Sequence, residues 1–431
     1  MLYSNLSVNE KGHLTLAGVD TVSLAEKYGT PLYLIDENRV RKNMRLYRDT
    51  MRREFGEGSY PLYASKALSM KQIYRIAREE DIGIDVVSSG ELYTALSADF
   101  PASAIFFHGN NKTDEDIEYA VDNDIGFFVA DNIDEITYIN KYAESKGKVQ
   151  SVLLRLTPGI DPHTHAAITT GKVDSKFGTP IETGDAEKLV LRVLELPNIK
   201  LAGYHCHIGS QCFESTPFYR AAEIMVGFAA VMQKKYGVAA EYINLGGGYG
   251  VRYTEAQPAI DLESEITNVA KAVRRVCADN GIAQPRILME PGRSIVADAG
   301  VTLYTVGSVK RIKDYKNYVS VDGGMTDNPR YALYGAEYTV LNASRAADKA
   351  DLVASVVGRC CESGDIIQEN VSLKTPVRGE KLAVLVTGAY NYSMSSEYNR
   401  IPKPPVVMIR DGKDYLASRR QSLQDIVRLD I

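Results

Sequence analysis

Polar residues that can do chemistry stand at the ends of short apolar runs in the first two thirds of the chain. Lys66 follows YPLYAS, Asp85 lies inside GIDVVS, and Glu290 closes RILMEP. Other runs end in the same way, at His108, Arg155, His205, His207 and Gly246–Gly248. Any one of these could be a capping or satisfied polar residue. At the ends of successive parallel strands, however, they would meet at one mouth, so the sequence predicts a site there.

Lys66 offers the most specific chemistry of these residues. It follows the first run and is flanked by Ala64, Ser65 and Ala67. Burial among such small residues would lower the pKa of its amine and favour the neutral form, which can form a Schiff base with an aldehyde. A surface lysine at the start of a helix is the alternative.

The segment Gly246-Gly247-Gly248-Tyr249-Gly250 can present backbone N–H groups to an anion, because glycine has no Cβ to obstruct the approach. A tight turn explains the glycines equally well. The spacing fits neither the ATP-type P-loop nor G-x-G-x-x-G. Ser210 in HIGSQ and Arg293 in EPGR are further anion donors. A phosphate site after late strands favours a phosphorylated cofactor.

The histidines do not predict a metal site. His205 and His207 share a face only if one strand continues through both, while His163 and His165 lie in a polar loop. The sequence contains neither H-E-x-x-H nor C-x-x-C, so we expect no zinc. A histidine at the mouth beside a glycine-rich loop instead favours an aromatic platform for a planar cofactor. A satisfied core histidine is the alternative.

The elements that would position these residues alternate between residues 60 and 291. Segments with helical spacing, such as 70–81 and 265–280, separate the apolar runs. Eight such runs begin near Tyr60, Gly83, Ala104, Gly126, Ser151, Lys200, Glu241 and Arg286. This α/β pattern of roughly eight units predicts a closed (β/α)₈ TIM-type barrel. A doubly wound open sheet, which usually has fewer strands, is the alternative.

The pattern changes after Asp298, where strand-like runs follow one another mostly without intervening helices. It predicts a mostly β second domain built from the C-terminal part and the N-terminal segment. We expect the barrel to span 36–298 and the β-rich domain to comprise 1–35 and 299–431. The polar loop at 158–180, which follows a barrel strand, is expected to act as a lid.

Composition narrows the class of protein. The 431 residues are 45% hydrophobic and 24% charged with a net charge of −5, which fits a globular protein and argues against a nucleic-acid partner. No apolar run approaches the ~20 residues that span a bilayer, and residues 1–18 do not have the pattern of a secretory signal. Five cysteines, an odd count, make no disulfide framework and favour a cytoplasmic location.

Taken together, the motifs resemble those of the pyridoxal-phosphate (PLP) decarboxylases of the alanine-racemase-like fold, and most closely the diaminopimelate decarboxylases. They run from about residue 60 to about residue 400. One departure is Ser89, where the family often has glycine. The matching stretches are YASKAL, DVVSSGEL, HGNNK, HTHAAITTGKVDSKFG, GYHCHIGSQ, NLGGGYG, MEPGRSIV, DGGMTDNPRYALY, CESGD and GAYNYSMSSEYN.

The resemblance implies a role for each matched residue. Lys66 would hold PLP covalently, His207 would stack on its ring, and Glu290 would pair with its pyridine nitrogen. Cys361 would be the proton donor. The other cofactor-binding positions would be Asp85, Ser210, Gly246, Gly247, Gly248, Gly292, Arg293 and Tyr390. The substrate-binding positions would be Arg293, Arg330, Tyr334, Glu362 and Tyr390.

The resemblance also implies a homodimer with shared active sites, in which Cys361 and Glu362 come from the neighbouring subunit. A carboxylate such as Glu290 keeps the pyridine nitrogen protonated, which favours decarboxylation over racemisation. Arg330 could clamp a distal carboxylate and Glu362 a distal ammonium. These features favour conversion of meso-2,6-diaminopimelate to L-lysine and CO₂. A decarboxylase of another basic amino acid or of carboxynorspermidine, and a non-catalytic binding relative, are the alternatives.

Overall fold

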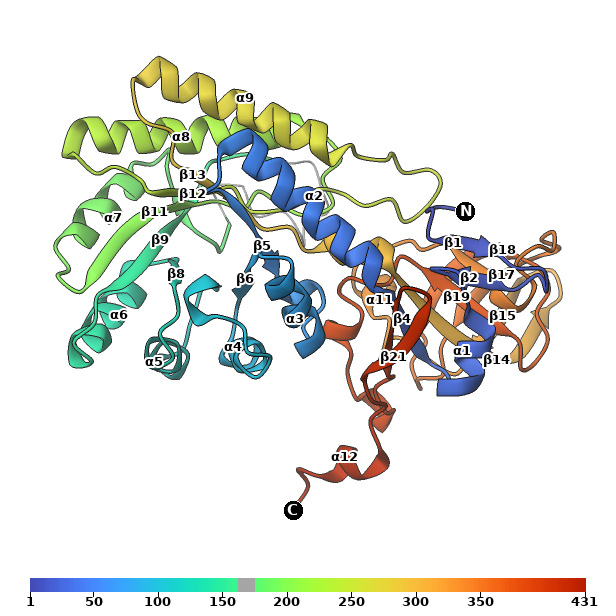
Figure 1. The fold of residues 1–431 in the computed structure, drawn as a ribbon. Coiled ribbons are helices and arrows are strands. Elements are labelled where there is room, and N and C mark those ends of the chain that lie inside the picture. The colour runs from blue at the N-terminus through green and yellow to red at the C-terminus, as the bar shows by residue number, and fades with distance from the viewer. Residues whose placement is uncertain (162–174) are drawn as a thin grey trace. The chain divides into compact units, whose positions relative to one another are not determined.

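A computed structural model of the chain describes residues 1–161 and 175–431 (Figure 1). The chain divides into a barrel unit, Asn43–Gly250 with Ile260–Gly292, and a β-rich unit, Met1–Lys42 with Val251–Ala259 and Arg293–Ile431. The predicted domain boundaries at 36 and 298 stay a prediction. His163, His165 and the middle of the predicted lid lie outside the described residues.

Eight parallel strands form the barrel. In spatial order these are β5 (Tyr60–Ala64), β6 (Gly83–Val86), β7 (Ile105–Phe107), β8 (Phe127–Ala130), β9 (Gln150–Thr157), β11 (Ile199–His205), β12 (Tyr242–Asn244) and β13 (Arg286–Met289). Pairing of β13 with β5 closes the ring, and the short β10 (Thr179–Pro180) pairs with β9 outside it. The predicted closed barrel is confirmed, and the open doubly wound sheet is excluded.

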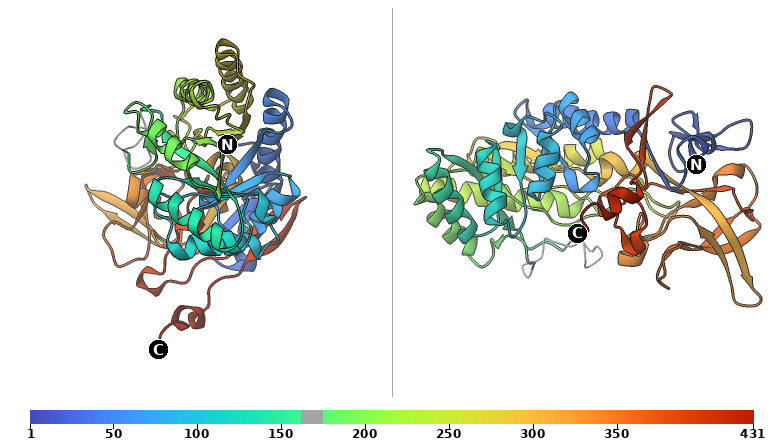
Figure 2. Two further views of the ribbon diagram at one scale, coloured as in Figure 1. Left: turned by 90° about the vertical axis from the view of Figure 1, so that its left-hand side faces the viewer. Right: turned by 90° about the horizontal axis from the view of Figure 1, so that it is seen from below.

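Helices lie around the outside of this ring (Figure 2). Helix α3 buries Ile73, Tyr74, Ile76 and Ala77 toward the strands, the spacing expected for an amphipathic helix. Helix α9 begins where the Asp261 side chain accepts from the Ser264 N–H. The barrel helices are α3 (Lys71–Glu79), α4 (Ser89–Leu96), α5 (Asp114–Asp122), α6 (Ile133–Ser145), α7 (Asp185–Leu194), α8 (Thr216–Tyr236) and α9 (Leu262–Asn280). The helices predicted at 70–81 and 265–280 are thus confirmed.

The barrel interior is filled by side chains. One buried cluster takes a residue from each of seven strands: Leu62, Phe106, Val129, Leu153, Ala202, Tyr242 and Leu288. Strands all around a closed ring can share such a cluster only inside it. The barrel is therefore a packed core, and its chemistry is confined to the rim.

The β-rich unit contains a sheet in the order β18-β17-β15-β14-β4-β20-β21, with β19 also paired to β14 and β16 paired to β19. N-terminal strand β4 lies between β14 and β20, which confirms that the N-terminal segment joins this domain. The sheet strands are β4 (Leu32–Asp36), β14 (Gly300–Ile312), β15 (Lys316–Val321), β16 (Val340–Asn342), β17 (Leu352–Val357), β18 (Ile366–Leu373), β19 (Lys381–Leu385), β20 (Val406–Arg410) and β21 (Lys413–Ser418).

Smaller elements complete the β-rich unit. A three-stranded sheet, β1 (Leu6–Val8), β2 (Leu14–Leu16) and β3 (Val19–Asp20), lies at the N-terminus. The helices are α1 (Thr21–Tyr28), α10 (Arg293–Val296), α11 (Arg330–Tyr334) and α12 (Leu423–Val427), and α2 (Glu37–Phe55) begins in this unit and ends in the barrel unit. Among the described residues, no helix combines the length and the apolar character needed to span a bilayer.

Candidate active site

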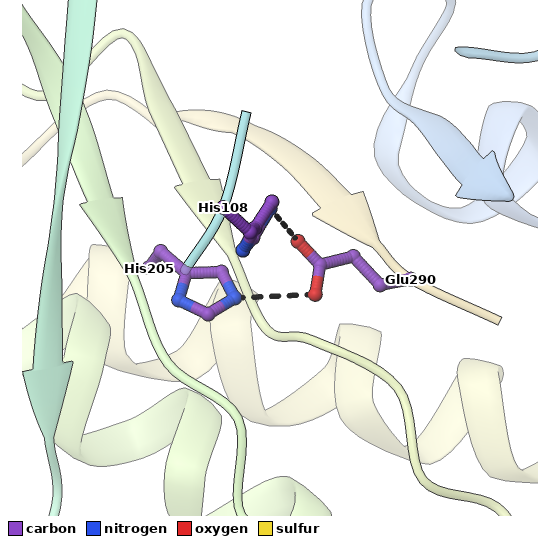
Figure 3. A group of neighbouring side chains, drawn as sticks. All are labelled: His108, His205 and Glu290. Atoms are coloured by element: carbon purple, nitrogen blue, oxygen red, sulfur yellow. Dashed lines mark hydrogen bonds and ion pairs between the residues drawn. The ribbon is translucent and has the colours of Figure 1, made fainter. Parts of the chain in front are cut away.

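Glu290 is a buried carboxylate directly after β13, and side chains from the ends of three other strands surround it. Figure 3 shows two of them, His108 and His205. His108 Nε2 lies 2.9 Å from Oε1, and His205 Nε2 lies 3.2 Å from Oε2. The Asn244 side-chain amide also donates to Oε1, at 2.6 Å. The ends of β7, β11 and β12 thus converge on one acid, as the parallel strand pattern predicts.

The Glu290 carboxylate is ionised at neutral pH. Burial alone would raise its pKa, but the adjacent His108 and His205 outweigh this and hold the pKa well below its ordinary range. Burial lowers the pKa of His205 to about 4 and also lowers the pKa of His108, so both rings are neutral at pH 7. A carboxylate accepts about four hydrogen bonds. His205 and Asn244 supply two, and His108 Nε2 lies close enough to occupy a third acceptor site. One acceptor site remains for the ring N–H of a bound cofactor, so the residues fit the PLP group that the resemblance implies.

His108, His205 and Glu290 have ligand atoms within 4.8 Å of one another, a spacing that a metal ion could use. Each is already engaged with a neighbour, and Asn244 binds the carboxylate as well. Hydrogen bonding therefore explains the cluster, and we assign no metal to it.

The three glycines form the turn that follows β12. A Cβ at Gly247 would collide with the carbonyl oxygen of Glu290, and one at Gly246 would lie 2.8 Å from His207 Nδ1. The Gly247 N–H donates to His207 Nδ1 at 3.2 Å, and the Gly246 N–H donates to Asn244 Oδ1 at 2.9 Å. Close approach of neighbouring loops thus requires the glycines, and two of their N–H groups are already used within the chain.

His207 is held as a neutral ring with a fixed tautomer. Burial, followed by the charges of Lys66 and Arg155, keeps the pKa of His207 well below its ordinary value. Because Nδ1 accepts the Gly247 N–H, any proton of the neutral ring is on Nε2. An uncharged, oriented imidazole suits the platform role predicted for it.

Lys66 lies in a short 3₁₀ turn directly after β5, and its side chain is exposed. The expectation that it is buried is therefore wrong: the small neighbours pack the backbone turn, while the long side chain leaves it. Its charge still acts on Asp85 and His207, so the amine belongs to the same rim as the glycine turn. Burial raises the pKa of Asp85 to about 8, and its carboxyl group is neutral at pH 7.

A second cluster lies in the β-rich unit and contains two predicted substrate-binding arginines. Arg293 and Arg330 are both buried. Arg293 Nη1 donates to the Tyr253 hydroxyl at 2.8 Å, and Arg330 Nη1 donates to the Tyr338 hydroxyl at 2.7 Å. The Arg293 guanidinium also lies 4.8 Å from the centre of the Tyr390 ring. The structure thus brings Arg293, Arg330 and Tyr390 into one group.

The CESGD segment forms an exposed loop in the same unit. Cys361 and Glu362 are exposed, whereas Cys360 and Asp365 are buried. The Asp365 carboxylate accepts the backbone N–H groups of Cys360 at 2.7 Å and Met325 at 2.6 Å, which fixes the base of the loop.

Three predicted site residues remain: Ser210, Gly292 and Tyr334. Ser210 and Gly292 belong to the barrel unit, and a Cβ at Gly292 would lie 2.8 Å from that of Ala64. Tyr334 ends helix α11, which begins at Arg330.

Sequence reasoning gave no role to Asn244, Tyr253 or Tyr338. Asn244 looks like a residue of a strand-ending turn, and only the pairing of β12 with β13 brings it to Glu290. Tyr253 follows the glycine turn by five residues, a proximity that could have drawn attention to it.

Comparison with known proteins shows the family to which the chain belongs. Residues 38–297 match the family described as "Pyridoxal-dependent decarboxylase, pyridoxal binding domain". The chain is 43% identical to the diaminopimelate decarboxylase of Bacillus subtilis over 430 residues, covering 100% of this chain and 98% of the relative. It is 44% identical to that of Staphylococcus aureus over 420 residues, covering 97% and 98%.

A crystal structure of diaminopimelate decarboxylase from M. jannaschii in complex with L-lysine superimposes with a TM-score of 0.91. The two are 32% identical, and the match covers 99% of this chain and 98% of that one. The match spans the β-rich unit as well as the barrel. The chain therefore belongs to the pyridoxal-dependent decarboxylases, and within them to the diaminopimelate decarboxylase family.

Proposed function

We propose that this protein removes CO₂ from meso-2,6-diaminopimelate and releases L-lysine, with PLP as its cofactor. The observation that carries the proposal is the buried, ionised carboxylate of Glu290 at the rim of the barrel. A carboxylate at this place favours a protonated pyridine nitrogen, as decarboxylation requires. The substrate follows from the full-length relatives, which are named diaminopimelate decarboxylases.

The residues assigned to the cofactor come from several loops. Lys66 would hold it covalently, His207 would lie against its ring, and Glu290 would accept the ring N–H. Its phosphate would lie among Ser210, Gly246–Gly248, Arg293 and Tyr390. Asp85 and Gly292 complete the set. When bound, PLP supplies a conjugated sink for the electron pair that remains at Cα after CO₂ leaves.

The chain's own groups set the conditions for this step. Glu290 keeps its charge because His108 and His205 hold the pKa of its carboxyl group well below the ordinary range. His207 is uncharged, so it adds no positive charge next to the ring. Arg330 and Tyr334, with Arg293 and Tyr390, would hold the carboxylate of the non-reacting end, and Glu362 its ammonium. The thiol of Cys361 would deliver the proton that replaces CO₂.

We also propose that the active protein is a cytoplasmic homodimer in which Cys361 and Glu362 serve the neighbouring subunit. Their exposure within one chain leaves them available for this. Analytical ultracentrifugation tests the dimer. Mixing two inactive variants, Lys66→Ala and Cys361→Ala, tests the shared site, because subunits that exchange should recover part of the activity. No recovery in a mixture that contains heterodimers would overturn the shared site.

The main test is incubation of the purified protein and PLP with meso-diaminopimelate, with CO₂ and lysine both measured. Stoichiometric lysine and CO₂ are expected. Lysine, ornithine, arginine and carboxynorspermidine in parallel reactions test the alternative substrates. Faster turnover of any of these, or cofactor binding without release of CO₂, would overturn the assignment.

A further inference from the structure

Tyr253 is a buried tyrosine between the two arginines of the β-rich unit and has no assigned role in the proposed function. It is 3% exposed. Arg293 Nη1 donates to its hydroxyl at 2.8 Å, and the Arg293 guanidinium carbon lies 5.8 Å from the centre of its ring. The Arg330 guanidinium carbon lies 5.2 Å from the same centre. One phenol therefore contacts both cations.

The two guanidinium groups need such a contact. Like charges in a buried place repel one another strongly because little water screens them. A phenol offsets this repulsion in two ways: its oxygen accepts a charged N–H, and the face of its ring attracts a cation. Burial would raise the pKa of Tyr253, but Arg293 and Arg330 outweigh it and lower the pKa below its ordinary value. The two cations thus favour the anionic form of the phenol.

The backbone of Tyr253 is fixed as well. Its N–H donates to the Gln257 side chain at 2.7 Å, and its carbonyl oxygen accepts the Thr339 hydroxyl at 2.9 Å. Its ring meets the Tyr338 ring edge to face, with centres 5.4 Å apart. Tyr338 in turn accepts from Arg330 and donates to Asn391 at 3.3 Å. Because other residues hold its backbone and ring, Tyr253 can fix the positions of the two arginine side chains.

We propose that Tyr253 is a positioning residue that holds Arg293 and Arg330 together as one anion clamp and so determines selectivity for a substrate with a distal carboxylate. This inference rests on the proposed function and deepens it. It assigns to Tyr253 no contact with the reacting atoms. Its effect should therefore appear in the recognition of the carboxylate and much less in the chemical step.

The test uses the holoenzyme and two ligands of equal chain length. L-Lysine keeps the carboxylate of the non-reacting end, whereas cadaverine carries none. In Tyr253→Phe the inhibition constant of lysine and the KM of diaminopimelate should each rise about tenfold or more, because a hydrogen bond to a charged group is lost. The inhibition constant of cadaverine and the kcat should change less than about twofold.

Tyr249→Phe is the matched control. Tyr249 is also a buried tyrosine, and its hydroxyl has no hydrogen-bond partner among the described residues. Loss of the Tyr249 hydroxyl should leave the inhibition constants of lysine and cadaverine unchanged. Direct calorimetric binding of lysine and cadaverine to each variant gives a readout that does not depend on turnover, and thermal melting checks folding.

The outcomes separate the two levels of the proposal. An active wild type whose Tyr253→Phe variant weakens lysine and cadaverine equally, or neither, overturns the positioning role alone. A Tyr249→Phe variant that reproduces the lysine effect also overturns it. A wild-type holoenzyme that releases no CO₂ from diaminopimelate overturns the proposed function, and this inference with it.

Discussion

The buried acid of the barrel differs in its surroundings from two exposed residues, Lys66 of the barrel unit and Cys361 of the β-rich unit. Glu290 is enclosed by three polar side chains from the ends of three strands, so both its charge and its position are fixed. Lys66 and Cys361 are exposed and project from turns. The acid only has to hold a charge, whereas a residue that forms a covalent bond or delivers a proton must reach its partner and move.

The difference teaches where rigidity is needed. A group that sets the charge at the site, such as Glu290, lies among neutral, hydrogen-bonded neighbours. Removal of one partner there would leave another buried polar group unpaired, at a cost in free energy. A group that reacts lies on an exposed loop whose backbone is fixed by a buried residue. Asp365 does this for the loop of Cys361 by accepting the Cys360 N–H. Substitutions in the two classes should therefore fail in different ways.

The largest effect is expected for Lys66→Ala, which removes the amine that would hold the cofactor. Activity should fall at least about a thousandfold, because covalent attachment and the exchange onto substrate are both lost. The absorbance band of the bound cofactor near the visible edge should disappear. Lys71→Ala, a change of another exposed lysine five residues away, should retain both the band and the activity. A fully active Lys66→Ala enzyme would contradict the assignment.

Glu290→Gln is expected to lower kcat by about a hundredfold to a thousandfold, because it removes the preorganised negative charge and keeps the shape. Steady-state kinetics of the folded, cofactor-loaded variant measures this. Glu135→Gln is the contrasting variant, since Glu135 is a buried barrel carboxylate paired with Lys112 at 2.7 Å. That change should lower the melting temperature, with kcat nearly unchanged. Similar kcat losses in both variants would argue that Glu290 is only structural.

Adjacent cysteines allow a sharper comparison. Cys361→Ser should reduce kcat about a hundredfold through loss of the proposed proton donor, whereas Cys360→Ser should affect mainly stability. Burial, and then the nearby charge of Asp365, raises the pKa of Cys360 to about 11. A thiol reagent at neutral pH should therefore modify Cys361 first, as peptide mass spectrometry can show. Faster labelling of Cys360 would contradict the exposed and buried assignments.

The smallest effect is a pH dependence of stability. The pKa of His205 is about 4 in the fold, because burial lowers it from 6.5, so the unfolded chain binds more protons between these values. The free energy of unfolding should fall as the pH drops through this window, by about 2 kcal/mol for a decrease of about 1.5 pH units below 6.5. Urea unfolding at several pH values measures the slope. In His205→Asn the slope should be shallower, and an unchanged slope would rule out this source.

Much of the barrel could be predicted from the sequence, because each buried parallel strand is an apolar run and each following helix is amphipathic. The residues at the strand ends followed directly, since parallel strands finish at one rim. Lys66 was misjudged on burial because its small neighbours describe backbone packing and do not set the path of a four-carbon side chain.

Partnerships between distant strands could not be predicted in this way. Asn244 meets Glu290 only because β12 and β13 are neighbours in register. In the sequence, Tyr253 and Tyr338 look like ordinary aromatic residues. Their role depends on hydrogen bonds from Arg293, 40 residues from Tyr253, and from Arg330, 8 residues from Tyr338. Such contacts depend on the closed three-dimensional arrangement and leave no local pattern.

The place of β4 between β14 and β20 has a consequence for synthesis on the ribosome. All eight barrel strands are encoded without interruption between residues 60 and 289, so the barrel strands can pair while translation is still under way. Strand β4, which is made earlier, cannot acquire its parallel neighbour until residue 410 has emerged. Its antiparallel neighbour, the start of β14, is made only at residues 300–303. The nascent chain therefore carries an unpaired apolar strand through most of elongation, and this strand is open to non-native pairing during that time.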